Sequence, residues 1–351
     1  MANWYCGRRA VKVAAGINGG DQDPIVDRLI EAASRRIDQE TRRRFIPETA
    51  TRLYRWPHRL TAPTIFWLDQ DLLSVTTLLA KAQDTTPTTI ATADYFLEPQ
   101  SLGPPYNRIE IDLSSSAAFE AGDTPQRSIS VAGTWGYGNS TKAGGTVASG
   151  LASDATATTF VCSNSALIDV GDTLLIQSEQ LFVSGMASAV LGTILLNGAL
   201  TATKSQVSVT VDGSHGIVAG EVILVDSEKM FVEAVSTNVL TVVRAYDGST
   251  LAAHADDTPV HIYRTLTVVR GVNGTTGAVH ADATAISLYV PPLDITNLCL
   301  AETIAMFSQE RAQWGRELGG VEGATELTGR ALTDLRRRVT ANYRRVREAA
   351  I

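Results

Sequence analysis

Apolar residues recur every four positions from Ile25 to Ile37, which is the spacing of one face of an α-helix. Asp23 can cap the first turn through its carboxylate, and Pro24 suits the first helical position, where its missing N–H costs nothing. Arginines lie off this apolar stripe and gather where the helix runs out, at 42–44. The pattern predicts a long amphipathic helix with an arginine-rich end.

Three further segments have a helical pattern. Residues 8–17 are expected to form a short helix ahead of the long one. Directly after two prolines at 291–292, Asp294 begins a helix that runs to about Arg316. The last helix is expected over 330–350, with few apolar positions, all on one face, and arginines over most of the rest.

The segment 49–138 has the pattern of short β-strands. Apolar and polar positions alternate in runs of a few residues, which glycine and proline turns separate. We expect a meander of short strands attached to the helices, an α+β arrangement.

The segment 139–290 is different in composition and contains internal repeats. Its sequence is rich in Ala, Gly, Ser, Thr and Val, residues 170–183 match 219–232, and 240–256 match 266–282. The second repeat carries the dipeptides Asp247-Gly248 and Asn273-Gly274, which favour the positive φ of tight hairpin turns. These features predict an all-β insert with a sandwich or barrel-like fold, as one domain or two.

The expected fold class is therefore α+β: a small helical bundle plus short β-strands, interrupted by an all-β sandwich or barrel-like insert. The N-terminal part of the interrupted domain covers 1–138, the insert 139–290, and the C-terminal helices 291–351.

Charge is divided along the chain in the same way. The net charge is −7, and residues 139–290, with six basic and thirteen acidic residues, account for all of it. Eleven arginines fall in residues 1–60 and nine in 291–351, with only five between. A guanidinium pairs in a planar, bidentate way with carboxylates and phosphates, which suits subunit interfaces and nucleic-acid contact. The alternative is a solvated helix face.

The arginines near the predicted helix ends are candidates for contact with a partner, a neighbouring subunit or DNA. They are Arg35, Arg36, Arg42, Arg43, Arg44, Arg330, Arg336, Arg337, Arg338, Arg344, Arg345 and Arg347.

No set of residues in the sequence indicates catalysis. His254 and His280 occupy equivalent positions of the repeat, so we expect them to stabilise turns. The repeated Ser-Glu pairs at 178–179 and 227–228 have the pattern of a polar turn between two strands. The glycine-rich run at 133–138 lacks the Lys-Ser/Thr that follows a phosphate-binding loop. We therefore expect neither an enzyme nor a cofactor.

Cysteine usage and hydropathy exclude other classes of protein. Cys6, Cys162 and Cys299 lie far apart without metal-ligand spacing, so we expect small buried hydrophobes, and no zinc site or disulfide framework. No apolar run approaches the roughly 20 residues that span a bilayer, and the N-terminus lacks the apolar core of a secretory signal. The expectation is no metal, no membrane and synthesis in a reducing compartment.

Several sequence motifs occur along the chain in one order and spacing. They are the run from Leu29 to Phe45, the strand phrases at 67–75, 94–99, 105–110 and 129–138, and a final helix that ends in Asn342-Tyr-Arg-Arg. In this order and spacing, residues 1–138 and 291–351 resemble the head–tail connector, or adaptor, proteins of tailed bacteriophages. The insert departs from that family's pattern, and its repeats resemble β-modules of other phage structural proteins.

The resemblance implies a structural virion protein that joins capsid to tail. It implies a ring beneath the portal, expected to be a dodecamer, that lines the DNA exit channel in the neck of the virion and assembles in the host cytoplasm. The implied partners are the portal protein, tail-side proteins (a stopper, tail terminator or tail nozzle), the packaged DNA passing through the lumen and, through the insert, the capsid vertex. Whether the arginine-rich last helix meets portal, neighbour or DNA stays open.

Two other functions are consistent with the pattern. The repeated hairpins could belong to a phage tail or receptor-binding protein, or a carbohydrate-binding module. Such a binder would usually place its β-modules at a terminus, whereas here they interrupt a domain. A glycan hydrolase would need aromatic sugar platforms, which are scarce in the insert.

Overall fold

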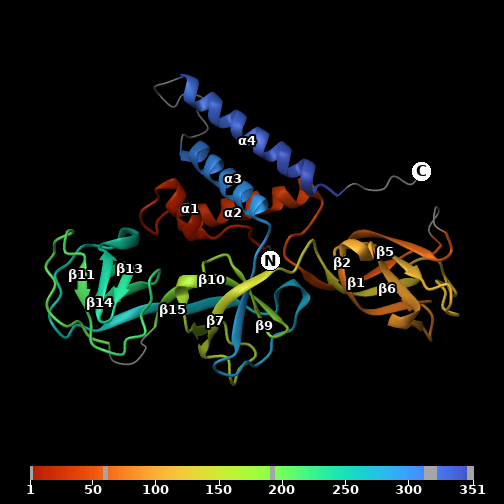
Figure 1. The fold of residues 1–351 in the computed structure, drawn as a ribbon, viewed down its shortest axis with the longest axis horizontal. Coiled ribbons are helices and arrows are strands. Elements are labelled where there is room, and N and C mark those ends of the chain that lie inside the picture. The colour runs from red at the N-terminus through yellow and green to blue at the C-terminus, as the bar shows by residue number, and fades with distance from the viewer. Residues whose placement is uncertain (1–2, 58–61, 190–193, 312–321, 346–351) are drawn as a thin grey trace.

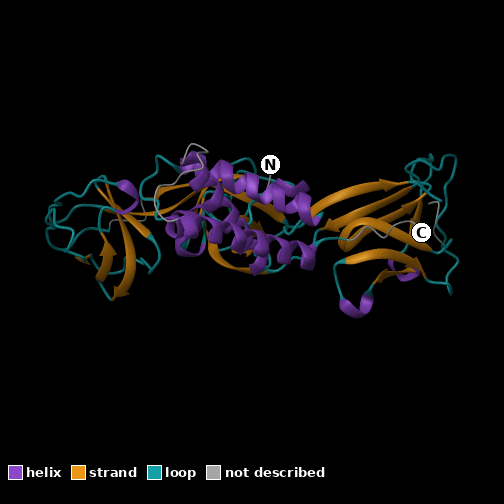
Figure 2. Cartoon of the chain, turned by 90° about the horizontal axis from the view of Figure 1, so that it is seen from above, coloured by secondary structure: helices purple, strands orange, loops and turns teal. Residues whose placement is uncertain are grey.

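The computed structural model of the chain describes residues 3–57, 62–189, 194–311 and 322–345. Three β bodies lie in a row, and a layer of helices covers the middle one (Figures 1 and 2). Four separate clusters of buried apolar side chains correspond to the helical layer and the three β bodies.

The helical layer joins the two ends of the chain. It consists of α1 (Arg8–Ala15), α2 (Asp23–Thr41), α3 (Leu293–Arg311) and α4 (Glu322–Tyr343). The predicted apolar stripe of α2 is buried, and α3 packs against it. The predicted capping role of Asp23 is wrong: Gln22 is the N-cap, and the Asp23 carboxylate pairs instead with Arg8 and Lys12 of α1. The last helix also begins earlier than predicted, at Glu322.

The N-terminal β body is a six-stranded sheet. Its strands are β1 (Glu48–Tyr54), β2 (Ile65–Ala80), β3 (Thr88–Ile90), β4 (Tyr95–Glu98), β5 (Tyr106–Ile111) and β6 (Ile129–Trp135). They follow the order β1-β6-β2-β5-β4, and β3 pairs with the end of β2. Aromatic residues fill its core, with Trp56, Phe66 and Phe119 in mutual contact.

The middle body is a closed six-stranded barrel. It contains β7 (Thr141–Ser149), β8 (Thr159–Cys162), β9 (Thr173–Ile176), β10 (Glu179–Ala189), β15 (Val260–Val269) and β16 (Ala285–Tyr289). The hydrogen-bonded order β10-β9-β16-β7-β8-β15 returns to β10, so this barrel has no free edge.

The distal β body completes the row. It contains β11 (Ser208–Thr210), β12 (Val222–Val225), β13 (Glu228–Ser236) and β14 (Val239–Val243). Its β12 pairs with the first residues of β15, whose later residues pair with β8 and β10 of the closed barrel. One strand therefore belongs to both bodies.

The expected fold class is wrong. The chain is mostly β, with sixteen strands and four α-helices among its described residues, and it is not a small connector-type helical bundle. The helices share a single small core and form a layer over the barrel. The physical reason is that long amphipathic helices give a strong periodic signal, whereas many short strands each give a weak one, so the sequence overstates the helices.

Each repeat contains the same buried cluster of a glutamate, an arginine and a histidine. Glu228 accepts two hydrogen bonds from Arg244 at 2.7 and 2.8 Å, one from Nε2 of His254 at 2.9 Å and two from backbone amides. Glu179 repeats this arrangement atom for atom with Arg270, His280 and two amides. The histidines were predicted to stabilise turns, and the structure gives them a further contact: each imidazole binds a buried carboxylate that also binds the arginine.

The repeated Ser-Glu pairs do lie at a turn between two strands, as the sequence predicts, but each glutamate begins the second strand and is buried. The side chains of Glu228 and Arg244 are both 0% exposed. Burial acts to raise the pKa of Glu228, but the hydrogen bonds from Arg244, His254 and the amides lower that pKa to about 2. The ion pair is thus retained in the interior because every charged atom has a partner.

Replacing Glu228 by Gln should destabilise the distal body by roughly 3–5 kcal/mol, because it leaves the Arg244 guanidinium buried without its counter-charge. Denaturant unfolding, with hydrogen exchange of residues 194–262 as a local readout, measures the loss. Glu233→Gln, at an exposed position of the same strand, is the matched control. Equal stabilities of the two variants would show that the buried pair does not hold the repeat.

Candidate functional site

The ends of α2 and α4 meet, and they bring arginines from both ends of the chain together. The amide of Arg345 donates to the carbonyl of Thr41 at 2.8 Å. Beside this contact the rings of Phe45, Tyr137 and Tyr343 pack against one another at centroid separations of 5.4–5.7 Å. Residues 42–44, from the first part of the chain, therefore lie next to the end of the last helix.

Two of the gathered arginines point inward. Arg43 and Arg345 both pair with Asp71 of β2, and Arg345 also donates to the carbonyl of Leu68 at 2.9 Å. The guanidinium of Arg43 lies 5.0 Å from the ring centroid of Tyr137. These side chains tie the helical layer to the N-terminal β body, so they are structural contacts.

Four more arginines of the predicted set form ion pairs with residues of the same chain. Arg36 and Arg336 share the buried carboxylate of Glu302 on α3. Arg35 pairs with Asp38 and donates to the carbonyl of Asn3, and Arg44 pairs with Glu48. The partners of Arg35 and Arg44 lie three and four residues further along the chain, whereas Glu302, which binds Arg36 and Arg336, is distant from Arg36 in sequence and could not be assigned from it.

The remaining arginines face solvent. Arg42, Arg338 and Arg344 are exposed and form no ion pair with any residue that the structure describes. Arg337 is 82% exposed and pairs with Asp334, and Arg330 is exposed on the same helix. Arg347 lies outside the described residues. We call Arg337 and Arg338 of α4, together with Arg344 directly after its last residue, the outer arginine face of α4, which is the outermost helix of the layer (Figure 1).

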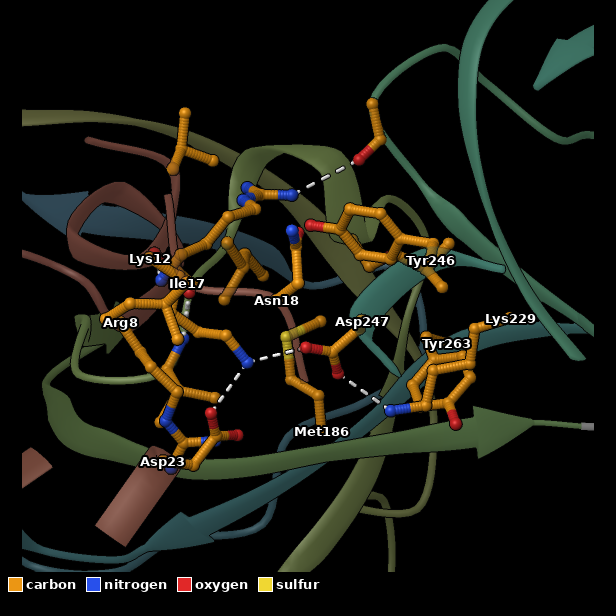
Figure 3. A pocket seen from close by; sticks show the side chains of 18 of the residues that line it. Arg8, Lys12, Ile17, Asn18, Asp23, Met186, Lys229, Tyr246, Asp247 and Tyr263 are labelled. Carbon is orange, nitrogen blue, oxygen red and sulfur yellow. Dashed lines mark hydrogen bonds and ion pairs between the residues drawn. The ribbon is translucent and has the colours of Figure 1, made fainter. Parts of the chain in front are cut away.

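A pocket lies between α1 and the β repeats. This pocket has a volume of about 270 Å³ and is lined by both charged and apolar side chains. Figure 3 shows Lys12 between the carboxylates of Asp23 and Asp247, with Lys229 on the other side of Asp247. Burial alone would lower the pKa of Lys12, but its two carboxylate partners raise it. The ion pairs of Lys12 and Lys229 with Asp247 make this pocket a junction between α1 and the distal body.

The repeats dock onto the N-terminal segment with the same turn. Asp247 of one copy bonds to Lys12, and the equivalent Asn273 of the other bonds to Asn3 at 2.9 Å. Both turn residues have positive φ, as the sequence predicts. The glycine after each approaches backbone closely: a Cβ on Gly248 would lie 2.6 Å from Cα of Gly19. The Asp-Gly and Asn-Gly dipeptides are therefore docking contacts, a role that the sequence did not suggest.

The other chemistry considered from sequence does not form a site. Among residues outside the masked stretches, no group of three or more His, Cys, Asp or Glu side chains is placed to hold a metal ion. No helix in the described part of the chain is long and apolar enough to cross a membrane. Gly133 lies in β6, where a Cβ would meet the carbonyl oxygen of Ser74 at 2.1 Å, so this glycine serves strand packing.

Replacing Gly248 by Ala should loosen the distal body from α1, because the new methyl group would overlap the backbone at Gly19. Gly216→Ala is the matched control, since Gly216 has a similar positive φ but open space around it. Limited proteolysis and hydrogen exchange at α1 report the docking. Backbone strain should cost both variants about 1 kcal/mol, and only Gly248→Ala should expose α1. Equal exchange at α1 in the two variants would contradict the docking role.

The anchorage of α1 on the barrel predicts a dependence on pH. Asp169 accepts from the amide of Arg9 at 2.9 Å, and its own amide donates to Asp172 at 2.7 Å. Burial and the neighbouring Asp169 raise the pKa of Asp172 to about 7. A raised folded-state pKa means that the folded protein binds more protons than the unfolded chain between about pH 4 and 7. Stability from this group therefore falls as pH rises through that window.

Asp172→Asn should remove this component, so that its unfolding free energy changes less between pH 5 and pH 8 than that of the wild type. Asp282→Asn, at an exposed position, should retain the wild-type dependence. Denaturant unfolding at both pH values checks the difference, and parallel slopes for all three proteins would refute it.

No protein-family model, curated protein or solved structure matches this chain.

Proposed function

We propose that this protein is a structural component of a tailed bacteriophage, a head-to-tail adaptor that assembles as a ring beneath the portal and joins capsid to tail. The observation that carries the proposal is the outer arginine face of α4. Arg337 and Arg338 lie on the outermost helix of the layer, and Arg344 directly follows it, close to the exposed Arg42 because the amide of Arg345 bonds to the carbonyl of Thr41. The mostly β fold of the chain, which is not a small helical bundle, carries no part of this proposal.

The packing of α4 supports a docking role. Only Val339 of its described side chains is fully buried, and Leu332, Leu335 and Tyr343 are partly buried against the helical core. A helix held by so narrow an apolar stripe leaves most of its surface for a second partner. In a ring, each exposed arginine is repeated in every subunit, so pair energies of about 0.2–1 kcal/mol each add up across the assembly.

The chemistry of the face indicates the kind of partner. Guanidinium groups bind carboxylates and phosphates in a planar fork. We assign the acidic surface of the portal protein as the partner of α4, with packaged DNA passing through the ring and tail-side proteins on its opposite side. The inward arginines Arg43 and Arg345 would hold the docking end of the layer rigid, since both are fixed on Asp71.

Light scattering of the purified protein, alone and mixed with portal, tests the proposal. We expect a ring-sized complex with portal, and at least tenfold weaker binding when Arg337, Arg338 and Arg344 are all changed to Glu, because each reversal turns attraction into repulsion.

The matched control changes three exposed basic residues elsewhere to Glu, Arg127, Lys142 and Lys204, which alters the net charge equally. This control should bind portal as the wild type does. A protein that ignores portal but binds glycans through residues 139–290 would overturn the adaptor proposal in favour of a binding module. Equal weakening by both triple variants would show that only net charge matters.

A further inference from the structure

Two cysteines that are 293 residues apart in sequence touch in the core of the helical layer. Cys6 lies in the segment before α1 and Cys299 lies on α3. Their sulfur atoms are 3.3 Å apart, and both are free thiols. From the sequence, all three cysteines are expected to be small buried hydrophobes. The long separation of Cys6 and Cys299 along the chain does not indicate that they are in contact.

The surroundings of the pair differentiate the two sulfurs. The hydrogen bond that Cys6 donates to Cys299, together with burial, raises the pKa of the Cys6 thiol above its ordinary range. The same hydrogen bond lowers the pKa of Cys299, and the hydroxyl of Ser34, 3.4 Å from its sulfur, acts in the same direction. Cys299 therefore has the greater thiolate character, whereas Cys6 is the more accessible, at 7% exposure against 0%.

We propose that Cys6 and Cys299 are a redox modification site, which forms a disulfide when the protein meets a thiol oxidant such as glutathione disulfide. Cys6 is the sulfur that the oxidant can reach. Once Cys6 has lost its proton, its thiolate attacks one sulfur of glutathione disulfide, the other sulfur leaves as a glutathione thiolate that takes up that proton, and a mixed disulfide forms on Cys6. The Cys299 thiolate then attacks the Cys6 sulfur, and the second glutathione leaves with the electron pair of the broken bond. Glutathione disulfide is reduced to two thiols, which take up the two protons that the cysteines lose.

The geometry suits closure. The sulfurs need to approach by a little more than 1 Å to reach the bond length of about 2.05 Å. Cys6 precedes the first helix, in irregular backbone that can follow this movement, while Cys299 is held on α3.

The bond would fasten the start of the chain to its C-terminal helices. Trp4, two residues from Cys6, packs on Phe182 of the closed barrel at a centroid separation of 5.3 Å. Oxidation would thus link the N-terminal segment, which contacts the barrel through Trp4, covalently to α3. This inference rests on the thiol geometry alone and does not depend on the proposed function.

The full-length reduced protein is incubated with glutathione disulfide, then denatured and alkylated. We expect two of its three thiols to be lost, an intact mass lower by two hydrogen atoms, and a peptide that links residues 6 and 299. The midpoint of thermal unfolding should rise by about 5 °C and return on treatment with dithiothreitol. This comparison uses only the wild type, so it does not depend on a variant that folds.

Cysteine variants identify the pair. Cys162 is buried in the closed barrel, where burial raises the pKa of its thiol to about 11, and Cys162→Ser is the matched control that should still form the bond. Cys6→Ser or Cys299→Ser should abolish it. Three free thiols after oxidation, a glutathione adduct that persists on Cys6, or a bond lost in Cys162→Ser would each overturn the proposal.

Discussion

The structure depends on the docking of residues 3–9 between the closed barrel and the helical layer. Trp4 lies edge-on to Phe182 and so close to Gly171 that a Cβ there would fall 2.3 Å from its ring. The amide of Tyr5 donates to Ser34 of α2, and the amide of Arg8 to the carbonyl of Val170. This short segment contributes Tyr5 and Cys6 to the helical core and contacts the barrel through Trp4 and Arg8, so it fixes the helices on the barrel.

Buried ion pairs set the arrangement of the repeats. Glu179 and Glu228 each accept hydrogen bonds from an arginine, a histidine and two amides. Glu221 likewise binds an arginine, at the boundary between the closed barrel and the distal body. Glu221 accepts from Arg264 on β15 and from Ser165 of the barrel, at 2.6 and 3.1 Å. Such groups tolerate few alternatives, since a slip of register would leave a charge buried without a partner. These buried polar groups therefore fix the register of each repeat.

Local patterns in the sequence predicted local structure well. The apolar spacing of α2 and the positive φ of Asp247 and Asn273 follow from the residues themselves. What the sequence could not predict depends on distant contacts. Nothing near Arg43 or Arg345 indicates that both bind Asp71, so structural and exposed arginines looked alike. The fold class failed for a related reason, because barrel closure depends on pairing between β10 and β15, far apart in the chain.

The shared strand β15 has a mechanical consequence. Its first residues pair with β12 of the distal body, and its later ones with β8 and β10 of the barrel. At this strand, a load on the distal body passes to the barrel through continuous backbone and lateral hydrogen bonds. A displacement of the distal body therefore pulls directly on a strand of the barrel beneath the helices.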